Sequence, residues 1–332
     1  MGRTPPREGS TSSSGLEAQR AREETIPAFA ATRLETLLLI AGSVRPRQWT
    51  KNLLLAFPFF FSVGERWSLQ EVRLGAELFL TSLYAVLAFC ALSGAVYMFN
   101  DIIDRSQDRQ HPTKRSRPIA SGRLPVSWAA GGSAILAAAA LSAGFYLSVL
   151  LGMLMLVYAA INLSYSSFLK RVVLLDVFVL SSGYVLRLVA GSVLIDVATS
   201  PWLYTTIGLG ALFIVLGKRY SELVHANGNA TIQRTVLELY TPALLGQLLV
   251  ITASFTLVAY SLYTFTAPNL PSNHLMMVTL VFVLFGMFRY LYLVHSRQAG
   301  ETPETTIISD TPLLLTILGW GLTTALLLAF QR

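Results

Sequence analysis

Three aspartates follow one another at short intervals where the sequence reads Asn100-Asp101-Ile-Ile-Asp104-Arg-Ser-Gln-Asp108. On a continuous helix, spacings of three and four residues place the three carboxylates within roughly 60° of one another. Carboxylates crowded on one face repel each other unless a cation neutralises them. Oxygen-only ligands suit Mg²⁺, which keeps several waters and bridges carboxylates to substrate phosphates. We therefore predict a magnesium site, in which Tyr97, one turn earlier on the same face, hydrogen-bonds the ligand.

A basic segment with Lys114, Arg115 and Arg117 follows directly. Alone, such a loop is typical of a topology determinant. Beside a carboxylate cluster it predicts a clamp whose cations bind the phosphate oxygens that the metal does not reach. The alternative for the acids is a solvated helix end paired with Arg105 and Arg109. We favour the metal site, because the acids begin at membrane depth, where charges are unfavourable and usually functional.

Two further cations lie inside apolar runs. Lys51 follows the interfacial anchor Trp49 and lies deeper, where an unpaired charge is unfavourable, so an anionic partner is expected. Arg187 is expected near mid-membrane, and it lies within about 20° of Asp176 around a helix. Arg187 is either a structural strut inside the bundle or faces a polar cavity that holds phosphate, and both alternatives stay open.

The composition shows what must position these residues. Of 332 residues, 53% are hydrophobic and 13% charged, and mean hydropathy is +0.56. This low charge content cannot cover a water-exposed surface. We therefore predict an all-α, polytopic membrane protein whose solvent is the lipid bilayer. The net charge of +7 lies in short loops between apolar runs, and we expect no nucleic-acid partner. Cys90 is the single cysteine, which excludes an intramolecular disulfide.

Nine transmembrane helices are predicted around these residues. They cover residues 48–63, 75–99, 126–147, 149–166, 173–194, 201–217, 243–265, 274–295 and 311–330. An amphipathic stretch, 33–44, precedes the first and is expected in the membrane interface. Residues 1–32 are polar and read as a disordered cytoplasmic tail, which leaves 33–332 as the transmembrane domain.

Lysines and arginines set the predicted topology. With the N-terminus inside, the internal loops carry Arg105, Arg109, Lys114, Arg115, Arg117, Arg123, Lys170, Arg171, Lys218, Arg219, Arg234 and Arg297. The external loops carry Arg66 and Arg73. This asymmetry predicts a cytoplasmic N-terminus, an external C-terminus and an active site on the cytoplasmic side of the plasma membrane.

The aspartate segment resembles the first motif, N-D-x-x-D-x-x-x-D, of the UbiA superfamily of intramembrane prenyltransferases. Asn100, Asp101, Asp104 and Asp108 match it position by position. The resemblance implies nine transmembrane helices around a central cavity that opens to the cytoplasm. The family also has a second aspartate-rich motif for a prenyl diphosphate, and only Asp176 stands in that region here.

Three segments, 45–52, 111–115 and 165–176, resemble one branch of the superfamily, the decaprenyl-phosphate phosphoribosyltransferases. That branch implies Mg²⁺-dependent transfer of 5-phosphoribosyl from phosphoribosyl diphosphate (PRPP) to decaprenyl or another polyprenyl phosphate. The products are decaprenylphosphoryl-5-phosphoribose, for cell-wall arabinan, and diphosphate. The resemblance implies that the three aspartates are catalytic and bind the metal. The expected substrate-binding residues are Lys51, Tyr97, Asn100, Lys114, Arg115, Arg117, Tyr165, Lys170, Asp176 and Arg187.

Two other functions are compatible with parts of this pattern. A prenyltransferase would move an isoprenoid from a prenyl diphosphate to an aromatic or haem-like acceptor, but the second aspartate cluster that it would use is missing. A transporter would place polar residues near the midplane. Here nearly all ionisable residues gather on one side, as an enzyme that takes a soluble substrate from the cytoplasm requires. The sequence sets no oligomeric state, and a homo-oligomer is allowed.

Overall fold

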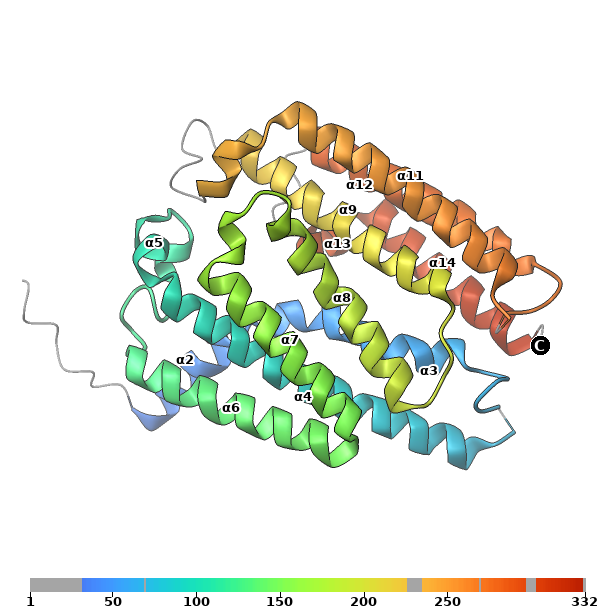
Figure 1. Cartoon of the computed structure of the whole chain (residues 1–332), viewed down its shortest axis with the longest axis horizontal. Coiled ribbons are helices and arrows are strands. Elements are labelled where there is room, and N and C mark those ends of the chain that lie inside the picture. The colour runs from blue at the N-terminus through green and yellow to red at the C-terminus, as the bar shows by residue number, and fades with distance from the viewer. Residues whose placement is uncertain (1–31, 69, 226–234, 269, 297–302, 331–332) are drawn as a thin grey trace, which may run out of the picture.

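The computed structural model describes residues 32–68, 70–225, 235–268, 270–296 and 303–330. These residues form a bundle of long helices that run roughly along one direction (Figure 1). Eight helical segments are long and apolar enough to cross a membrane. Their helices are α4 (Val72–Ile103), α6 (Val126–Leu147), α7 (Val149–Ser167), α8 (Leu175–Leu194), α9 (Pro201–His225), α11 (Pro242–Thr266), α12 (Leu280–Ser296) and α14 (Thr311–Phe330). The all-α, multi-pass membrane class is confirmed, whereas the predicted tail lies almost wholly outside the described residues.

The first predicted span, 48–63, differs from the other eight. It is a 3₁₀ helix, η1 (Pro46–Ala56), followed by the five-residue helix α3 (Phe57–Phe61). A count of nine spanning α-helices is therefore not confirmed. With rises of about 2.0 Å and 1.5 Å per residue, the two pieces together extend about 30 Å, close to the thickness of the hydrocarbon core. The segment thus has the reach of a membrane crossing without being one continuous α-helix.

Three residues per turn give η1 three separate rows of side chains. One row is buried or half-buried on α4 and α8 and contains Trp49, Asn52 and Leu55. A second row, continued into α3, lines a central cavity and contains Lys51, Leu54 and Phe57. The third row is exposed and contains Arg47, Thr50 and Leu53. The first row thus packs on the bundle and the second forms the cavity wall, whereas Thr50 and Leu53 of the exposed third row border the rim of the same cavity.

Small residues let η1 lie directly on its neighbours. A Cβ atom on Gly191 of α8 would overlap the main chain of Leu55, so only glycine fits at this crossing. Leu55 is buried together with Phe89 of α4 and Met155 of α7 in one apolar cluster. The packing therefore fixes η1 against the α4–α7–α8 half of the bundle.

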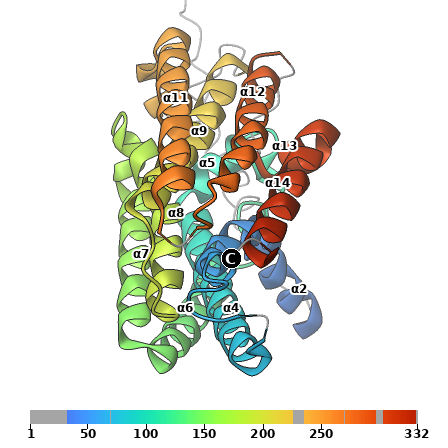
Figure 2. The ribbon, with the colours of Figure 1, turned by 90° about the vertical axis from the view of Figure 1, so that its right-hand side faces the viewer.

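The helices divide around η1 (Figure 2). α13 (Pro303–Ser309) and α14 lie on one side of the bundle, and α6 and α7 on the other. Trp320 of α14 ties the first side to the rest, because its Nε1 donates to the Tyr260 hydroxyl over 2.8 Å. Its ring also stacks on Phe57 at 6.4 Å between centroids.

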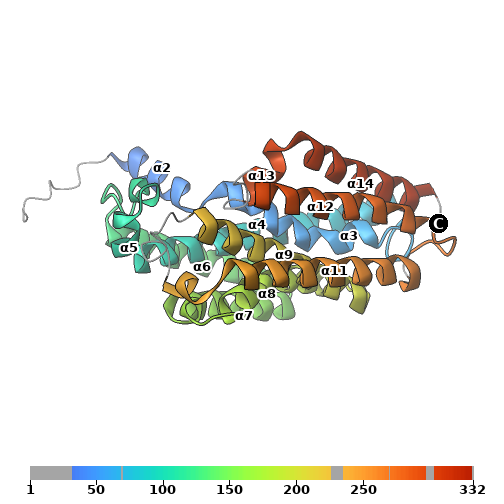
Figure 3. The same cartoon turned by 90° about the horizontal axis from the view of Figure 1, so that it is seen from above.

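The short helices α2 (Arg33–Ser43) and α5 (Arg105–Gln110) mark one end of the bundle, opposite the C-terminus (Figure 3). Helix α2 covers the predicted amphipathic stretch and begins with a capping box between Thr32 and Glu35. Its eleven residues extend only about 16 Å, too short to span. Leu39 and Ile40 pack against the bundle, and a row of leucines on the opposite side is exposed.

Candidate active site at the α5 end of the bundle

The aspartate segment lies at a break between two helices. Helix α4 ends at Ile103, and α5 begins after Asp104, whose φ of −83° and ψ of 3° depart from helical values. The expectation that three carboxylates share one helix face is therefore wrong, because spacing predicts a common face only on a continuous helix. Within the described residues, no three His, Cys, Asp or Glu side chains form a group placed to hold a metal.

Two of the three carboxylates nevertheless converge. Nη1 of Arg117 donates to Oδ1 of Asp101 over 3.0 Å and to Oδ2 of Asp108 over 2.7 Å. Asp101 also accepts a hydrogen bond from Arg45, whose guanidinium lies over the Tyr97 ring, 5.2 Å from its centroid. Both carboxylates are buried, whereas the side chains of Arg45 and Arg117 are 20% and 27% exposed. The two acids thus point toward one positively charged nitrogen at the edge of the protein.

The third carboxylate meets the loop between α7 and α8. Nζ of Lys170, in the short 3₁₀ helix η3 (Leu169–Arg171), donates to Asp104. Lys114 is half-buried and Arg115 is exposed, both in η2 (Lys114–Ser116), and Asn100 is half-buried near the end of α4. The α5 end thus combines three carboxylates with cations from three loops.

His111 belongs to the same basic segment. Partial burial lowers the pKa of its imidazole, and the neighbouring Lys114 lowers that pKa further. His111 is therefore predominantly neutral at pH 7, which leaves the positive charge of this segment to its lysine and arginines.

A polar layer lies deeper in the bundle, around Arg187. This side chain is 3% exposed, and its guanidinium donates to Oδ1 of Asn52 (2.6 Å), the Tyr158 hydroxyl (2.9 Å) and the Gly183 carbonyl (2.6 Å). Among the described residues no carboxylate lies within salt-bridge distance of it. Arg187 is therefore a buried strut held by neutral groups, one of which, Asn52, is the chain neighbour of Lys51.

Asp176, in contrast to Arg187, lies in a buried network of ionic and hydrogen-bonding protein groups. Its Oδ2 accepts from Nε of Arg219 over 2.8 Å and its Oδ1 from the Tyr240 hydroxyl over 2.7 Å. Arg219 also donates to Glu222 (2.6 Å) and to the Tyr165 hydroxyl (3.3 Å). Asp176 and Arg219 are 0% exposed, so the predicted substrate contacts of Asp176 and Tyr165 are replaced here by protein partners. Burial and the bond to Asp176 raise the pKa of Tyr240, which stays protonated and donates.

Several residues of these networks escaped the sequence reasoning. Arg45 lies in the segment 45–52 that resembles the phosphoribosyltransferase branch, and that resemblance is the sequence signal that could have identified it. The topology argument counts Arg219 as a loop charge, whereas the structure buries it fully. No sequence pattern pointed to Tyr158 or Tyr240, because their partners lie far away along the chain.

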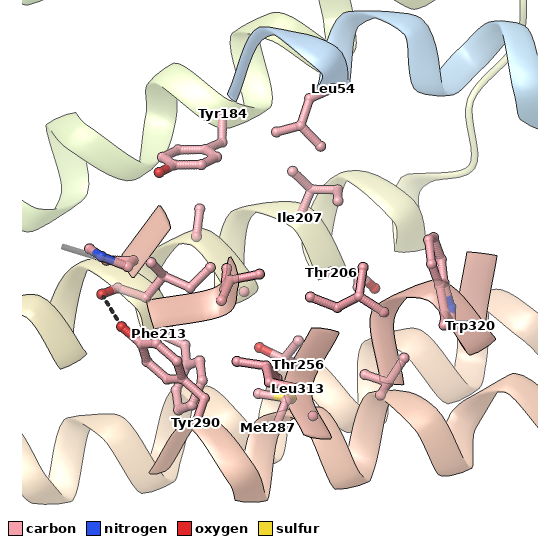
Figure 4. Close-up of a pocket in the computed structure, with 18 of the residues that line it drawn as sticks. Leu54, Tyr184, Thr206, Ile207, Phe213, Thr256, Met287, Tyr290, Leu313 and Trp320 are labelled. Carbon is pink, nitrogen blue, oxygen red and sulfur yellow. Dashed lines mark hydrogen bonds between the residues drawn. The ribbon is translucent and has the colours of Figure 1, made fainter. Parts of the chain in front are cut away.

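A cavity of about 590 Å³ extends between η1, α8, α9, α11, α12, α13 and α14 (Figure 4). Tyr184 and Leu54 lie on one wall and Tyr290 and Met287 on the wall opposite. Nearly all of the lining is apolar, and Lys51 is its charged residue among those described. Such a cavity suits a hydrocarbon chain that carries an anionic group at one end.

The chain has relatives of similar length. Residues 72–309 match the model of the UbiA prenyltransferase family. The decaprenyl-phosphate phosphoribosyltransferase of Mycolicibacterium smegmatis is 34% identical over 85% of this chain and 91% of its own length. That of Mycobacterium tuberculosis is 34% identical over 88% and 96%. The structure of a UbiA homologue from Archaeoglobus fulgidus bound to GPP and Mg²⁺ superposes with a TM-score of 0.65 at 19% identity, covering 88% of this chain and 98% of that one. The chain therefore belongs to the UbiA prenyltransferase family.

Proposed function

We propose that this protein transfers 5-phosphoribosyl from PRPP to decaprenyl phosphate, as a decaprenyl-phosphate phosphoribosyltransferase. One observation carries the proposal: a cluster of acids and bases suited to a metal-bound diphosphate lies at one end of a bundle whose interior holds an apolar cavity bordered by Lys51. Two anionic substrates, one soluble and one with a long hydrocarbon tail, need those two environments. The names of the mycobacterial relatives support the same reaction.

Asp101 and Asp108 would hold the Mg²⁺ ion. Their oxygens converge on the Nη1 atom of Arg117, so they offer a position for a cation between two buried carboxylates. Asp104 would join them once Lys170 turns toward a substrate phosphate. When bound, the metal supplies a Lewis acid that stabilises charge on the departing diphosphate.

The bases at the α5 end would bind the donor. Arg45, Arg117 and Lys170 are partly exposed and already neutralise carboxylates. Guanidinium groups match phosphate oxygens with paired hydrogen bonds, so exchange from carboxylate to phosphate keeps their charge compensated. Tyr97, Asn100, Lys114 and Arg115 would complete the shell around PRPP.

The acceptor phosphate would sit at Lys51, with the buried charge of Arg187 behind it. A phosphate monoester is anionic at neutral pH, so its oxygen attacks ribose C1 without a general base. The bond from C1 to the diphosphate oxygen breaks as the bond from C1 to the lipid phosphate forms. The polyprenyl tail would occupy the cavity and leave sideways into the bilayer past the exposed rim residues Leu53, Ile308 and Ile317.

The orientation of the bundle belongs to the same proposal. Because basic loops favour the cytoplasmic side, the α5 end and the N-terminus would face the cytoplasm, where PRPP is available. Labelling of cysteines introduced one at a time at Arg115 and at Glu65 in a Cys90→Ala background, with a reagent that does not cross membranes, tests this in intact cells. Labelling at position 115 but not at 65 would reverse the orientation.

The reaction itself is tested with purified protein in detergent, radiolabelled PRPP, decaprenyl phosphate and Mg²⁺. We expect label to move into an organic-extractable lipid, and EDTA to stop it. A second incubation supplies geranylgeranyl diphosphate and an aromatic acceptor. Turnover only there would replace the proposal with prenyl transfer.

A further inference from the structure

The loop that delivers Lys170 ends in an unusual backbone conformation. Leu174, the last residue before α8, has a φ of 66° and a ψ of −41°. Residues with a Cβ rarely adopt positive φ. The Leu174 side chain is 41% exposed, so its packing contributes little to holding this turn. Backbone bonds close the turn on either side, from the Asp176 N–H to the Val172 carbonyl and from the Val177 N–H to the Leu174 carbonyl (both 3.1 Å), but the Leu174 N–H itself needs another contact.

That contact comes from Tyr240, which lies 66 residues further along the chain, between η4 (Thr235–Leu239) and α11. Its hydroxyl accepts the Leu174 backbone N–H over 2.7 Å and donates to Oδ1 of Asp176 over 2.7 Å. Tyr240 is 4% exposed, and Asp176 is in turn fixed by Arg219. One buried hydroxyl thus fastens the end of the loop to the rigid network at the start of α8.

The loop is stiff enough to transmit this restraint. Its backbone closes successive turns, from the Arg171 N–H to the Phe168 carbonyl (3.1 Å) and from the Val172 N–H to the Leu169 carbonyl (3.1 Å). Lys170 lies within the first of these turns and reaches Asp104. The bond from the Asp176 N–H to the Val172 carbonyl (3.1 Å) joins these turns to the start of α8, so a shift at Leu174 is expected to move the Lys170 ammonium relative to the acids.

We infer that Tyr240 is a positioning residue, which holds the Leu174 turn so that Lys170 faces Asp104 and the donor phosphate. The inference rests on the proposed function, because Lys170 acts on PRPP only if PRPP is the donor. Tyr240 itself touches neither substrate. Its effect should therefore appear in the KM for PRPP and in the dynamics of the loop.

The experiment compares wild-type protein with the Tyr240→Phe variant in detergent. Amide hydrogen exchange comes first, because it needs no substrate. In wild type we expect the Leu174 amide to be protected, and in Tyr240→Phe we expect amides 169–175 to exchange about 10-fold faster. The KM for PRPP should rise about 10-fold, with the KM for lipid within 2-fold. Tyr220→Phe, on the same apolar cluster but without a hydrogen bond to this loop, should match wild type.

A rescue separates positioning from folding. Glycine adopts positive φ without strain, so Leu174→Gly in the Tyr240→Phe background should return the KM for PRPP to within about 3-fold of wild type. A Leu174 amide that exchanges freely in wild type would overturn the inference even if Tyr240→Phe does not fold. An unchanged KM, or a raised KM without rescue, would also overturn it. If wild type does not use PRPP, the proposed function fails, and the exchange data alone decide whether Tyr240 holds the loop.

Discussion

Replacing Asp101 with asparagine separates the metal-binding role of this carboxylate from its contribution to folding. The substitution keeps the shape of the side chain and removes its charge. In the structure Asp101 accepts hydrogen bonds from Arg45 and Arg117. Both arginines keep other partners, since Arg117 donates to Asp108 over 2.7 Å and Arg45 lies on the Tyr97 ring.

The two expected effects differ in size. The arginines are partly exposed, so water compensates much of their lost pairing, and unfolding should become easier by only about 1–2 kcal/mol. Loss of one of two converging metal ligands should remove about 4 kcal/mol of transition-state stabilisation, or about 10³-fold in turnover. The activity of Asp101→Asn should therefore nearly vanish in a protein that still folds.

The assay combines label transfer from PRPP, thermal unfolding and Mn²⁺ binding followed by electron paramagnetic resonance. Asp310→Asn is the matched control, because Asp310 forms a comparable, partly exposed ion pair with Arg289 over 2.8 Å. It should lose similar stability and keep its turnover within about 2-fold. If Asp101→Asn retains more than a tenth of wild-type turnover, or binds Mn²⁺ as wild type does, the metal assignment is refuted.

Three further outcomes are expected. Arg219→Gln should lower the free energy of unfolding by about 3–5 kcal/mol, because it removes the cationic partner of the fully buried Asp176. The measurement is thermal unfolding, and a loss below about 1 kcal/mol would mean that water reaches this network. Gly191→Ala should fail to give monodisperse protein on size-exclusion chromatography, because its Cβ would overlap the main chain of Leu55, whereas Gly246→Ala has open space around it and should behave as wild type. Removal of divalent metal with EDTA should abolish turnover reversibly. The unfolding temperature should stay nearly unchanged, because Arg45, Arg117 and Lys170 already pair with the acids. A large fall in the unfolding temperature would show that the fold depends on the metal.

The long spans were predictable because their length and apolar content are set by the bilayer. The sequence predicts Lys170 as a substrate-binding residue but does not reveal its contact with Asp104, which lies 66 residues earlier in the chain. The sequence could not reveal the helix break at Asp104, since the same spacing also fits a continuous helix. Nor could it distinguish a loop arginine from the buried Arg219, whose partner Asp176 lies 43 residues earlier.

The conformation of η1 was hidden for a related reason. An apolar run has the same composition whether it folds as an α-helix or as a 3₁₀ helix, and 3₁₀ runs longer than three or four residues are uncommon. Its close crossing with α8 depends on Gly191, which the sequence does not connect to Leu55. The conformation of η1 and its crossing with α8 thus depend on tertiary contacts that residue type alone does not reveal.

The three rows of η1 make its packing sensitive to length, because the surroundings of its side chains repeat every three residues. Deleting or inserting one residue between Pro46 and Ala56 would rotate everything beyond it by about 120°. Another row of side chains would then face the cavity. Lys51, where it lies beyond the change, would turn into the bundle or toward the bilayer. Removing three residues would preserve the phase but shorten the segment by about 6 Å. Homologous segments should therefore tolerate substitutions within each row far better than any change in length that is not a multiple of three.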